Sequence, residues 1–452
     1  MRLSKYVNMI KKGEYYVVFH SHLGEACVVD QNIWTILKKI DSYKLDIDNK
    51  NVQEIVSEFT NKGFIVEDDK NYLKEIEEEI ISNIKTGAQI QTIQLIVSNN
   101  CNFNCKYCFE HSIYCSPERE KSQNDISNKI MNSEDAIDYI QKILQLICGR
   151  NVKRHLHIQF FGGEPLTNKD AIKAVLHKFE DGVRYGVELS YSIVTNGSLI
   201  DNEMAELFSK YNVAVIVSFD NPNKSDRIMK SGNNSIDKTK EVLKILQRFD
   251  AYVAFNSVLS EYTYDYFDTT IIDFAFENNV QEVGIVLDLN PDFYNKKDYK
   301  DIAKKILDIV DYGNKRGILV SGYWMSTYLS VLGHLECKKG FKTCSGTGSQ
   351  LSIEPNGTIF SCKGSSAYYG HVNDLQGLLE GEKYRRYVAR SVQNSPKCEG
   401  CEISGFCSGF CLGPLEQTYG DISHIVEPYC DLMRYLTESL LLREESLDKY
   451  EY

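Results

Sequence analysis

The sequence predicts an α/β protein whose central unit is a parallel sheet. Between residues 93 and 287, short β-branched runs alternate with amphipathic helical segments. Repeated strand and helix units predict parallel strands joined by right-handed crossovers. Six such runs, with polar residues at their C-terminal ends, indicate an open or closed barrel that binds ligands at that end. A small α+β unit is expected ahead of the barrel and a cysteine-rich domain behind it.

The first unit, residues 1–85, has the pattern of a winged helix. Its β-prone runs and amphipathic segments are short, and Asp30 can cap the first helix. The stretch 65–80 is acidic, which argues against a DNA-binding surface, and 74–81 is expected to be a solvated helix or linker. The expected elements are a hairpin over 14–30 with its turn at Ser21–Gly24, helices from residue 31 and over 52–60, and a strand over 62–66.

The central unit, residues 86–310, is expected to contain six strands and the helices between them. Ser133 can cap its first helix, and residues 111–130 have the composition of an irregular insertion. Strands are expected over 93–97, 155–161, 188–194, 213–217, 251–256 and 282–287. Helices are expected over 134–148, 168–180, 201–211, 235–249 and 265–279.

Three cysteines directly follow the first of these strands. Cys101, Cys105 and Cys108 form a C-x3-C-x2-C triplet on one loop, so all three thiols can point at one small object. An odd number of thiols fits a metal centre better than disulfides. A [4Fe–4S] cluster takes four ligands, so three would leave one iron open for a substrate or cofactor. The alternative, three unconnected cysteines, does not explain the spacing.

Polar motifs follow the next three strands. The glycines of Gly162-Gly163-Glu164-Pro165 allow close backbone approach. Glu164 or nearby carbonyls could accept hydrogen bonds from a cationic amine. Each motif is weak alone, but together they place polar groups at successive strand ends beside the triplet. The other two motifs are Thr195-Asn196-Gly197 and Ser218-Phe219-Asp220.

Residues 311–452 are expected to form the cysteine-rich domain. Pro355-Asn356-Gly357 predicts the turn of a hairpin, and the 436–447 helix is expected to be structural. Eight cysteines divide into two four-ligand sites, which zinc and iron–sulfur clusters would fill equally well on residue chemistry. Cys27, Cys115 and Cys148 fall outside every pattern and are expected to be free buried thiols. The eight are Cys337, Cys344, Cys362, Cys398, Cys401, Cys407, Cys411 and Cys430.

Composition narrows the class of protein. The chain has 452 residues and a formal net charge of −12, which argues against nucleic-acid binding. No apolar run is long enough to span a membrane, and the N-terminus lacks the apolar core of a secretory signal. We therefore expect a cytoplasmic protein whose fourteen cysteines stay reduced, with neither nucleic-acid nor membrane partners.

The triplet, with Tyr107 before its third cysteine, resembles the signature of the radical S-adenosylmethionine (SAM) enzymes, whose fold is a partial (β/α)6 barrel. The resemblance implies that the open iron binds the amine and carboxylate of SAM. One-electron cleavage of SAM then releases a 5′-deoxyadenosyl radical. It also implies that the residues lining SAM are Gly162, Gly163, Glu164, Pro165, Thr195, Asn196, Ser218, Asp220 and either Arg227 or Lys230.

The C-terminal cysteine spacing, C-x12-G-x4-C followed by C-x2-C-x5-C-x3-C and a distal cysteine, resembles the SPASM domain. This resemblance implies two auxiliary [4Fe–4S] clusters, and so three clusters in all. The first would be held by Cys337, Cys344, Cys362 and Cys411, and the second by Cys398, Cys401, Cys407 and Cys430.

The N-terminal pattern resembles the peptide-recognition domain of peptide-modifying radical SAM enzymes. There a leader peptide adds a strand to the sheet edge. The alternative is a structural cap without a ligand. Together the resemblances imply a maturase of a ribosomally made precursor peptide. We expect it to abstract hydrogen from the peptide and to close a cross-link, with a cysteine thioether as the first expectation and a carbon–carbon or ether bond as the second.

A flavodoxin or ferredoxin-type protein is the expected electron donor. One alternative enzyme is an anaerobic sulfatase maturase, but those relatives carry Asp after the equivalent of Cys362, where this chain has Lys363. The non-enzymatic alternative is an iron–sulfur regulator with a DNA-binding head.

Overall fold

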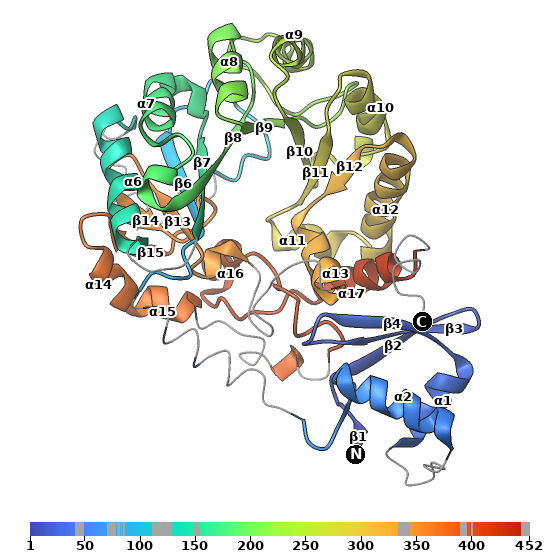
Figure 1. Cartoon of the computed structure of the whole chain (residues 1–452). Helices are drawn as coiled ribbons and strands as arrows, with labels where there is room; N and C mark the ends of the chain where they lie inside the picture. The colour runs from blue at the N-terminus through green and yellow to red at the C-terminus, as the bar shows by residue number, and fades with distance from the viewer. Residues whose placement is uncertain are drawn as a thin grey trace.

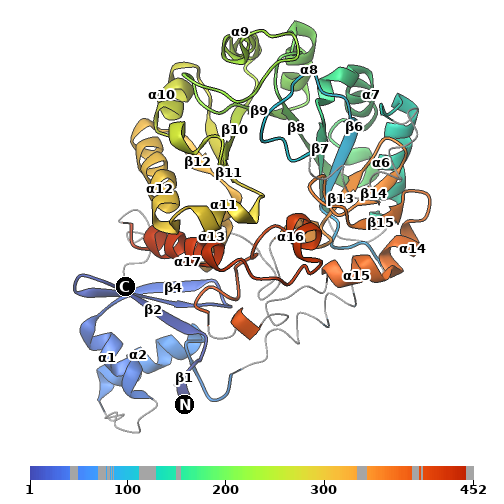
Figure 2. The ribbon, with the colours of Figure 1, turned by 180° about the vertical axis from the view of Figure 1, so that it is seen from behind.

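The computed structural model confirms the α/β class. A curved, mostly parallel sheet carries its helices on the outer face, and the N-terminal unit lies beneath the C-terminal helix α17 (Glu427–Leu441), as Figures 1 and 2 show. The structure describes residues 1–40, 49–69, 78, 82, 84, 86–110, 129–148, 154–332, 344–388, 396–398 and 401–443.

The central strands run parallel in the order β12-β11-β10-β9-β8-β7-β6. All six predicted strands are confirmed within a few residues. The seventh, β12, was not predicted because only three residues form it. The strands are β6 (Thr92–Ser98), β7 (Arg154–Gly162), β8 (Val187–Thr195), β9 (Val213–Ser218), β10 (Val253–Leu259), β11 (Glu282–Leu287) and β12 (Leu319–Ser321).

Helices cover the outer face of this sheet (Figure 1). Side chains alternate along each strand, so Leu95, Phe160 and Val215 point at the helices and are fully buried. The cap of α6 is Asn132, whose Oδ1 accepts from the Asp135 N–H at 2.7 Å, so the expected Ser133 cap is wrong by one residue. The helices on the outer face are α6 (Ser133–Ile147), α7 (Lys169–Phe179), α8 (Asn202–Lys210), α9 (Ser235–Arg248), α10 (Thr270–Glu277) and α12 (Tyr299–Arg316), whereas α11 (Pro291–Lys296) lies beside α17.

The N-terminal unit contains the predicted hairpin and helices, and the Asp30 side chain accepts from the Ile33 N–H at 2.8 Å. Two further strands were not predicted: one makes the hairpin a three-stranded sheet, and the other pairs with the expected strand near residue 65. The elements are β1 (Arg2–Leu3), β2 (Val7–Lys12), β3 (Tyr15–His20), β4 (Glu25–Asp30), α1 (Gln31–Lys39), α2 (Lys50–Asn61) and β5 (Ile65–Val66).

The C-terminal hairpin extends the central sheet. β13 pairs in parallel with β6, with Leu351 opposite Ile93, so β6 is hydrogen-bonded on both sides. The predicted turn is confirmed, since Gly357 donates to the Glu354 carbonyl at 2.9 Å and has a φ of +82°. The elements are α13 (Ser326–Val331), β13 (Gln350–Ile353), β14 (Thr358–Phe360), β15 (Tyr368–His371), α14 (Leu375–Glu380), α15 (Glu382–Val388), α16 (Leu412–Tyr419) and α17.

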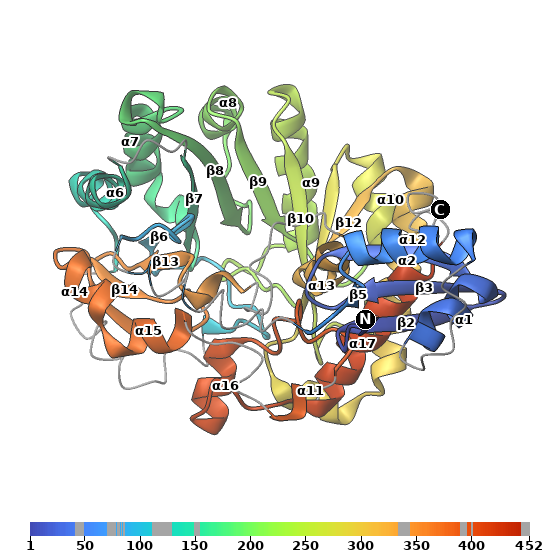
Figure 3. The same ribbon diagram turned by 60° about the horizontal axis from the view of Figure 1, so that its bottom comes forward.

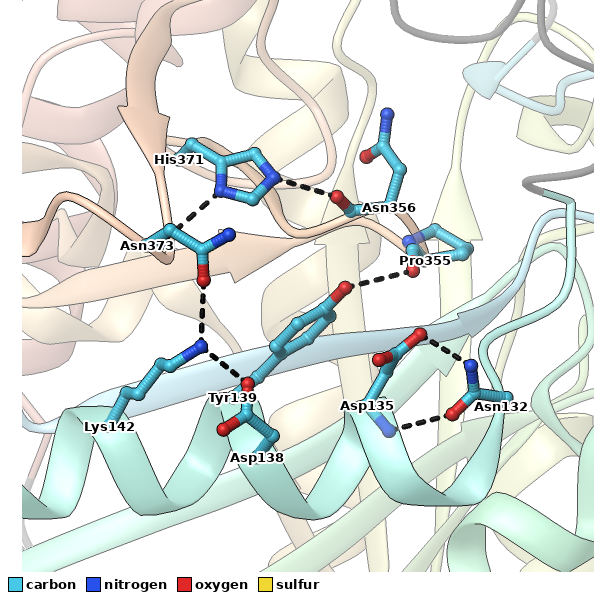
Figure 4. A network of polar contacts seen from close by, with 9 residues as sticks. All are labelled: Asn132, Asp135, Asp138, Tyr139, Lys142, Pro355, Asn356, His371 and Asn373. Carbon is cyan, nitrogen blue, oxygen red and sulfur yellow. Dashed lines mark hydrogen bonds and ion pairs between the residues drawn. The ribbon is translucent and has the colours of Figure 1, made fainter.

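Polar contacts hold this hairpin against α6 (Figure 4). The Tyr139 hydroxyl donates to the Pro355 carbonyl at 3.4 Å, and Lys142 Nζ donates to Asn373 Oδ1 at 2.7 Å. His371 Nε2 donates to the Asn356 carbonyl at 2.9 Å, which braces the turn itself. The hairpin is therefore fixed to the barrel by the sheet and by the first helix.

The N-terminal unit packs against the C-terminal domain (Figures 1 and 3). Phe19 and Phe406 are buried in one apolar cluster, and Asn8 Nδ2 donates to the Glu402 carbonyl at 3.3 Å. A Cβ on Gly405 would lie 1.7 Å from the Ser21 carbonyl oxygen, so only glycine permits this approach. Among the described residues, no helix combines the length and apolarity that crossing a membrane requires.

Gly405→Ala is expected to loosen this interface. The added methyl must push two backbones apart, a kind of overpacking that costs about 1–3 kcal/mol. Hydrogen exchange measured by mass spectrometry should therefore speed up at Ser21–Gly24 and around Phe406. Glu206→Ala, on an exposed helix face, is the control. Unchanged exchange in Gly405→Ala would contradict this packing.

Candidate active site

The cysteine loop leaves the C-terminal end of β6, as predicted. Cys101, Cys105 and Cys108 are half-buried. Burial raises the pKa of the Cys101 thiol to about 11 and that of Cys108 to about 12, with smaller contributions from the neighbouring cysteines and Glu110. Binding a metal as thiolates would repay this cost. The donor set therefore fits a thiolate-bound metal group.

No group of three His, Cys, Asp or Glu side chains among the described residues lies close enough to hold a single metal ion. The three half-buried thiols of the triplet are of the ligand type that binds a [4Fe–4S] cluster, and they number one fewer than the four ligands that such a cluster takes.

A neighbouring segment holds the cysteine loop in place. Phe103 and Met229 form an antiparallel bridge, and the Asn104 N–H donates to the Ile228 carbonyl at 2.7 Å. Lys230 Nζ donates to the Cys101 carbonyl at 2.9 Å. Lys230, the second candidate for the SAM carboxylate, therefore supports the backbone of the loop.

The two glycines after β7 are required by the loop. Gly162 has a φ of +144°, and a Cβ there would lie 2.0 Å from the Ser98 carbonyl oxygen. A Cβ on Gly163 would lie 2.7 Å from the Asn100 carbonyl oxygen. The Glu164 N–H donates to that same carbonyl at 2.7 Å. The end of β7 thus touches the backbone that enters the triplet.

The Glu164 carboxylate is fully buried and binds the protein itself. It accepts from the Thr195 hydroxyl at 2.6 Å, from the Asn196 N–H at 2.7 Å and from the Leu166 N–H at 3.0 Å. Pro165 is buried at the start of the short helix that follows. These contacts tie the ends of β7 and β8 together, so nearby carbonyls are better placed than this carboxylate to meet an amine.

The Asn196 side chain, like that of Glu164, is hydrogen-bonded within the protein. Its Nδ2 donates to Asn102 Oδ1 at 2.8 Å, and its Oδ1 accepts from the Ser198 hydroxyl at 2.7 Å. Thr195 and Asn196 therefore brace the cysteine loop from the third strand. Ser218, by contrast, is half-buried at the end of β9.

Tyr107, Asp220 and Arg227 form one hydrogen-bonded network, in which Asp220 is buried and the other two side chains are half-buried. The Tyr107 hydroxyl donates to Asp220 and accepts from Arg227 Nη1 at 3.0 Å. Arg227 Nε is buried and has no hydrogen-bond partner among the described residues. An anionic group at this position would satisfy that donor. The structure thus places Arg227, one of the two candidates for the SAM carboxylate, close to Cys105 of the triplet.

The sequence-based analysis missed a set of apolar side chains on the concave face of the sheet. Each lies two residues before a strand-end group, and Ile96 is opposite Phe161 while Val194 is opposite Ile216. None of these side chains belongs to a core cluster, and all but Ile96 are half-buried. The Phe161 ring lies 6.4 Å from that of Phe109, beside Cys108. We call this set the apolar layer; alternation along the strands could have revealed it.

Seven of the eight C-terminal cysteines are described and half-buried, and Cys337 lies outside the described residues. Tyr429 lies among four of them. Burial first, and then Cys407, Cys411, Cys430 and Cys344, raise the pKa of its hydroxyl. Its ring packs edge-on against Phe410 and Tyr294, with centroids 5.0 Å and 5.2 Å apart. Four of the seven described cysteines thus lie around one aromatic cluster.

Two of the remaining cysteines, Cys27 and Cys148, are described, and both are free thiols. Cys27 is buried in the N-terminal unit, and Cys148 Sγ donates to the Tyr185 carbonyl at 3.1 Å. Cys115 lies outside the described residues.

Comparisons with known proteins agree with this geometry. The model of the radical SAM superfamily matches residues 95–274. A relative from Paramaledivibacter caminithermalis, named radical SAM cyclopropyl synthase TigE, is 47% identical over 99% of this chain and 97% of its own length.

Two solved structures share the fold. Native anSMEcpe with bound AdoMet has a TM-score of 0.62 at 19% identity and covers 79% of this chain and 98% of its own. Streptococcus suis SuiB bound to precursor peptide SuiA has a TM-score of 0.55 at 13% identity and covers 95% and 99%.

Glu164→Gln is expected to destabilise the protein rather than to weaken SAM binding directly. The amide would place a donor against the donors of Thr195, Asn196 or Leu166, and a buried group left without a partner costs about 1–3 kcal/mol. Denaturant unfolding measures this loss, with Glu203→Gln on the surface as the control. Weaker SAM binding at unchanged stability would mean that the carboxylate contacts SAM itself.

Proposed function

Because the chain belongs to the radical SAM superfamily, we propose that it closes a cyclopropane ring in an aliphatic residue of a ribosomally made precursor peptide. Membership makes the chain an enzyme that uses SAM and a [4Fe–4S] cluster, and it excludes the non-enzymatic regulator. The bond is proposed on the 47% identity to a cyclopropyl synthase and on the apolar layer beside the cysteine loop.

Cys101, Cys105 and Cys108 are the residues that would hold the SAM-binding cluster. When bound, the cluster and SAM supply a 5′-deoxyadenosyl radical by one-electron cleavage. Arg227 would bind the SAM carboxylate through its buried Nε, and carbonyls at Gly162 and Gly163 would accept from the amine. Glu164, Thr195 and Asn196 would act by holding this strand-end frame, as would Tyr107 and Asp220 by orienting Arg227.

The apolar layer is the observation that carries the choice of substrate residue. Phe161, Val194 and Ile216 present half-buried hydrocarbon where the peptide would meet the radical. A cyclopropane closes between two carbons attached to a third, so the modified side chain must carry hydrogen on two such carbons, as a branched aliphatic side chain does. Transfer of such an aliphatic side chain from water to this layer is favourable. A substrate that reacts through a cysteine thiol does not require an aliphatic side chain here.

The chemistry of ring closure balances as a loss of two hydrogens from the peptide. One carbon–carbon bond forms and two carbon–hydrogen bonds break. One hydrogen leaves as an atom to the 5′-deoxyadenosyl carbon, and the second leaves as a proton and an electron. The electron acceptor is of the iron–sulfur class, and the eight C-terminal cysteines would hold it as two auxiliary clusters. A flavodoxin or ferredoxin-type donor would supply the electron that cleaves SAM.

The N-terminal unit would bind the leader of the precursor. Its sheet has the order β2-β3-β4, so among the described residues β2 and β4 each pair on one side only. A peptide strand can add to such an edge through main-chain hydrogen bonds.

We also propose that the chain divides into three units, residues 1–85, 86–310 and 311–452. Its proposed location is the cytoplasm.

Co-expression with the short peptide encoded beside this gene tests the function. We expect a mass loss of two hydrogens per ring, which tandem mass spectrometry should localise to one aliphatic residue. Any peptide cysteine should still react with an alkylating reagent. A loss localised to a blocked cysteine would instead support the thioether expectation. Cys101→Ala, Cys105→Ala and Cys108→Ala should abolish the modification, and an unchanged peptide with the wild-type enzyme would contradict the proposal.

Val194→Thr tests the apolar layer. The substitution keeps the shape of the side chain and replaces one methyl group with a hydroxyl, whose burial without a partner costs about 1–3 kcal/mol. Peptide modification should therefore slow about tenfold, whereas SAM cleavage without peptide should change little. Val183→Thr, at a valine that is 70% exposed, is the matched control. Modification at the wild-type rate in Val194→Thr would show that the layer does not contact the substrate.

A further inference from the structure

Lys363 is a buried cation held between two units of the protein. Its side chain is 2% exposed, and Nζ donates to Asn99 Oδ1 at 2.7 Å. The same Nζ lies 3.5 Å from Glu354 Oε1 and 3.7 Å from Glu110 Oε1. A buried ammonium is stable only with such partners. The contacts therefore form one charged cluster inside the protein.

The members of this cluster come from both ends of the cysteine loop. Asn99 stands two residues before Cys101, and Glu110 stands two residues after Cys108. The cation itself comes from the C-terminal hairpin, beside Cys362. One side chain of the C-terminal domain thus contacts both flanks of the triplet.

Lys363 is in turn fixed at its own backbone. Its N–H donates to Gln94 Oε1 on β6 at 2.7 Å. Asn99 Nδ2 donates to Glu354 Oε2 at 3.0 Å, so the hairpin carboxylate also holds the start of the loop. Because β13 and β14 belong to the same sheet as β6, these contacts are rigidly anchored.

We propose that Lys363 is a positioning residue for the SAM-binding site, which the C-terminal hairpin completes by clamping both ends of the cysteine loop. The proposal rests on the assignment of Cys101, Cys105 and Cys108 as cluster ligands. Lys363 does not meet the substrate, since its side chain is almost fully enclosed. It acts through Asn99 and Glu110, which set where the loop begins and ends.

Of the two loop residues that Lys363 contacts, Glu110 depends more strongly on the charge of Lys363 than the neutral Asn99 does. Its side chain is 10% exposed, and it stands two residues after Cys108. Removal of the Lys363 charge would leave Glu110 and Glu354 buried without this cation. Breaking a buried pair by removing one partner is strongly destabilising, so the carboxylates would have to move. Any movement of Glu110 shifts the end of the loop that carries Cys108.

The test compares the full-length wild-type holoenzyme with Lys363→Met and with Lys383→Met. Lys383 also pairs with a glutamate, at 2.6 Å, but its side chain is 41% exposed. Lys363→Met should weaken SAM binding about tenfold and alter the electron paramagnetic resonance (EPR) line shape that SAM induces in the reduced cluster. Lys383→Met should match the wild type in both measurements. Wild-type affinity and line shape in Lys363→Met would overturn the proposal.

If Lys363→Met does not fold, the variant Glu110→Gln tests the proposed role of Lys363 instead. This variant leaves Lys363 its contacts with Asn99 and Glu354, so it should lose less unfolding free energy than Lys363→Met and should fold. Its SAM affinity should still fall, because the downstream clamp is lost. Wild-type SAM affinity in Glu110→Gln would overturn the proposal. If the wild-type enzyme and Lys383→Met show no SAM-induced EPR change, the ligand assignment of the triplet is wrong, and Lys363 loses its role with it.

Discussion

The two-sided pairing of β6 is the constraint on which the rest of the site depends. β6 is hydrogen-bonded to β7 on one side and to β13 on the other, and the cysteine loop begins where it ends. A strand held on both edges cannot slip by one residue without moving its side chains to the wrong face. The start of the loop is therefore fixed by the sheet, and its course is then set by Gly162, Gly163 and the segment that ends at Lys230.

The strand-end residues divide into those that build the site and those that remain for a ligand. The Glu164 carboxylate accepts from the Asn196 N–H, and the Asn196 side chain donates to Asn102 in the cysteine loop. A fully satisfied buried network of this kind rigidifies a structure. Among the described residues, groups that remain available to a ligand include the buried Nε of Arg227 and the three thiols. A rigid network with a few groups available to a ligand fits a site that must hold one small molecule in one orientation beside a metal group.

Much of the fold could be predicted from the sequence because its signals are local. Alternating β-branched runs, the Asp30 cap and the Pro355-Asn356-Gly357 turn all act within a few residues. Among the strands that were missed, β1 and β12 pair with strands elsewhere in the chain. The parallel pairing of β13 with β6 joins residues about 260 positions apart, and no local pattern encodes it.

The same distinction holds for the site. Motif spacing predicted that Cys101, Cys105 and Cys108 lie together, and the family resemblance offered Arg227 or Lys230 beside them. Neither could reveal that Glu164 is hydrogen-bonded within the protein or that Lys363 reaches the loop. Both facts are properties of tertiary packing. The most direct test of the account is anomalous diffraction at the iron edge from anaerobic crystals of the holoenzyme grown with SAM. The account predicts iron among Cys101, Cys105 and Cys108 with SAM, and no fourth protein side chain, on the remaining corner. Iron absent from this loop, or a cluster closed by a fourth residue, would contradict it.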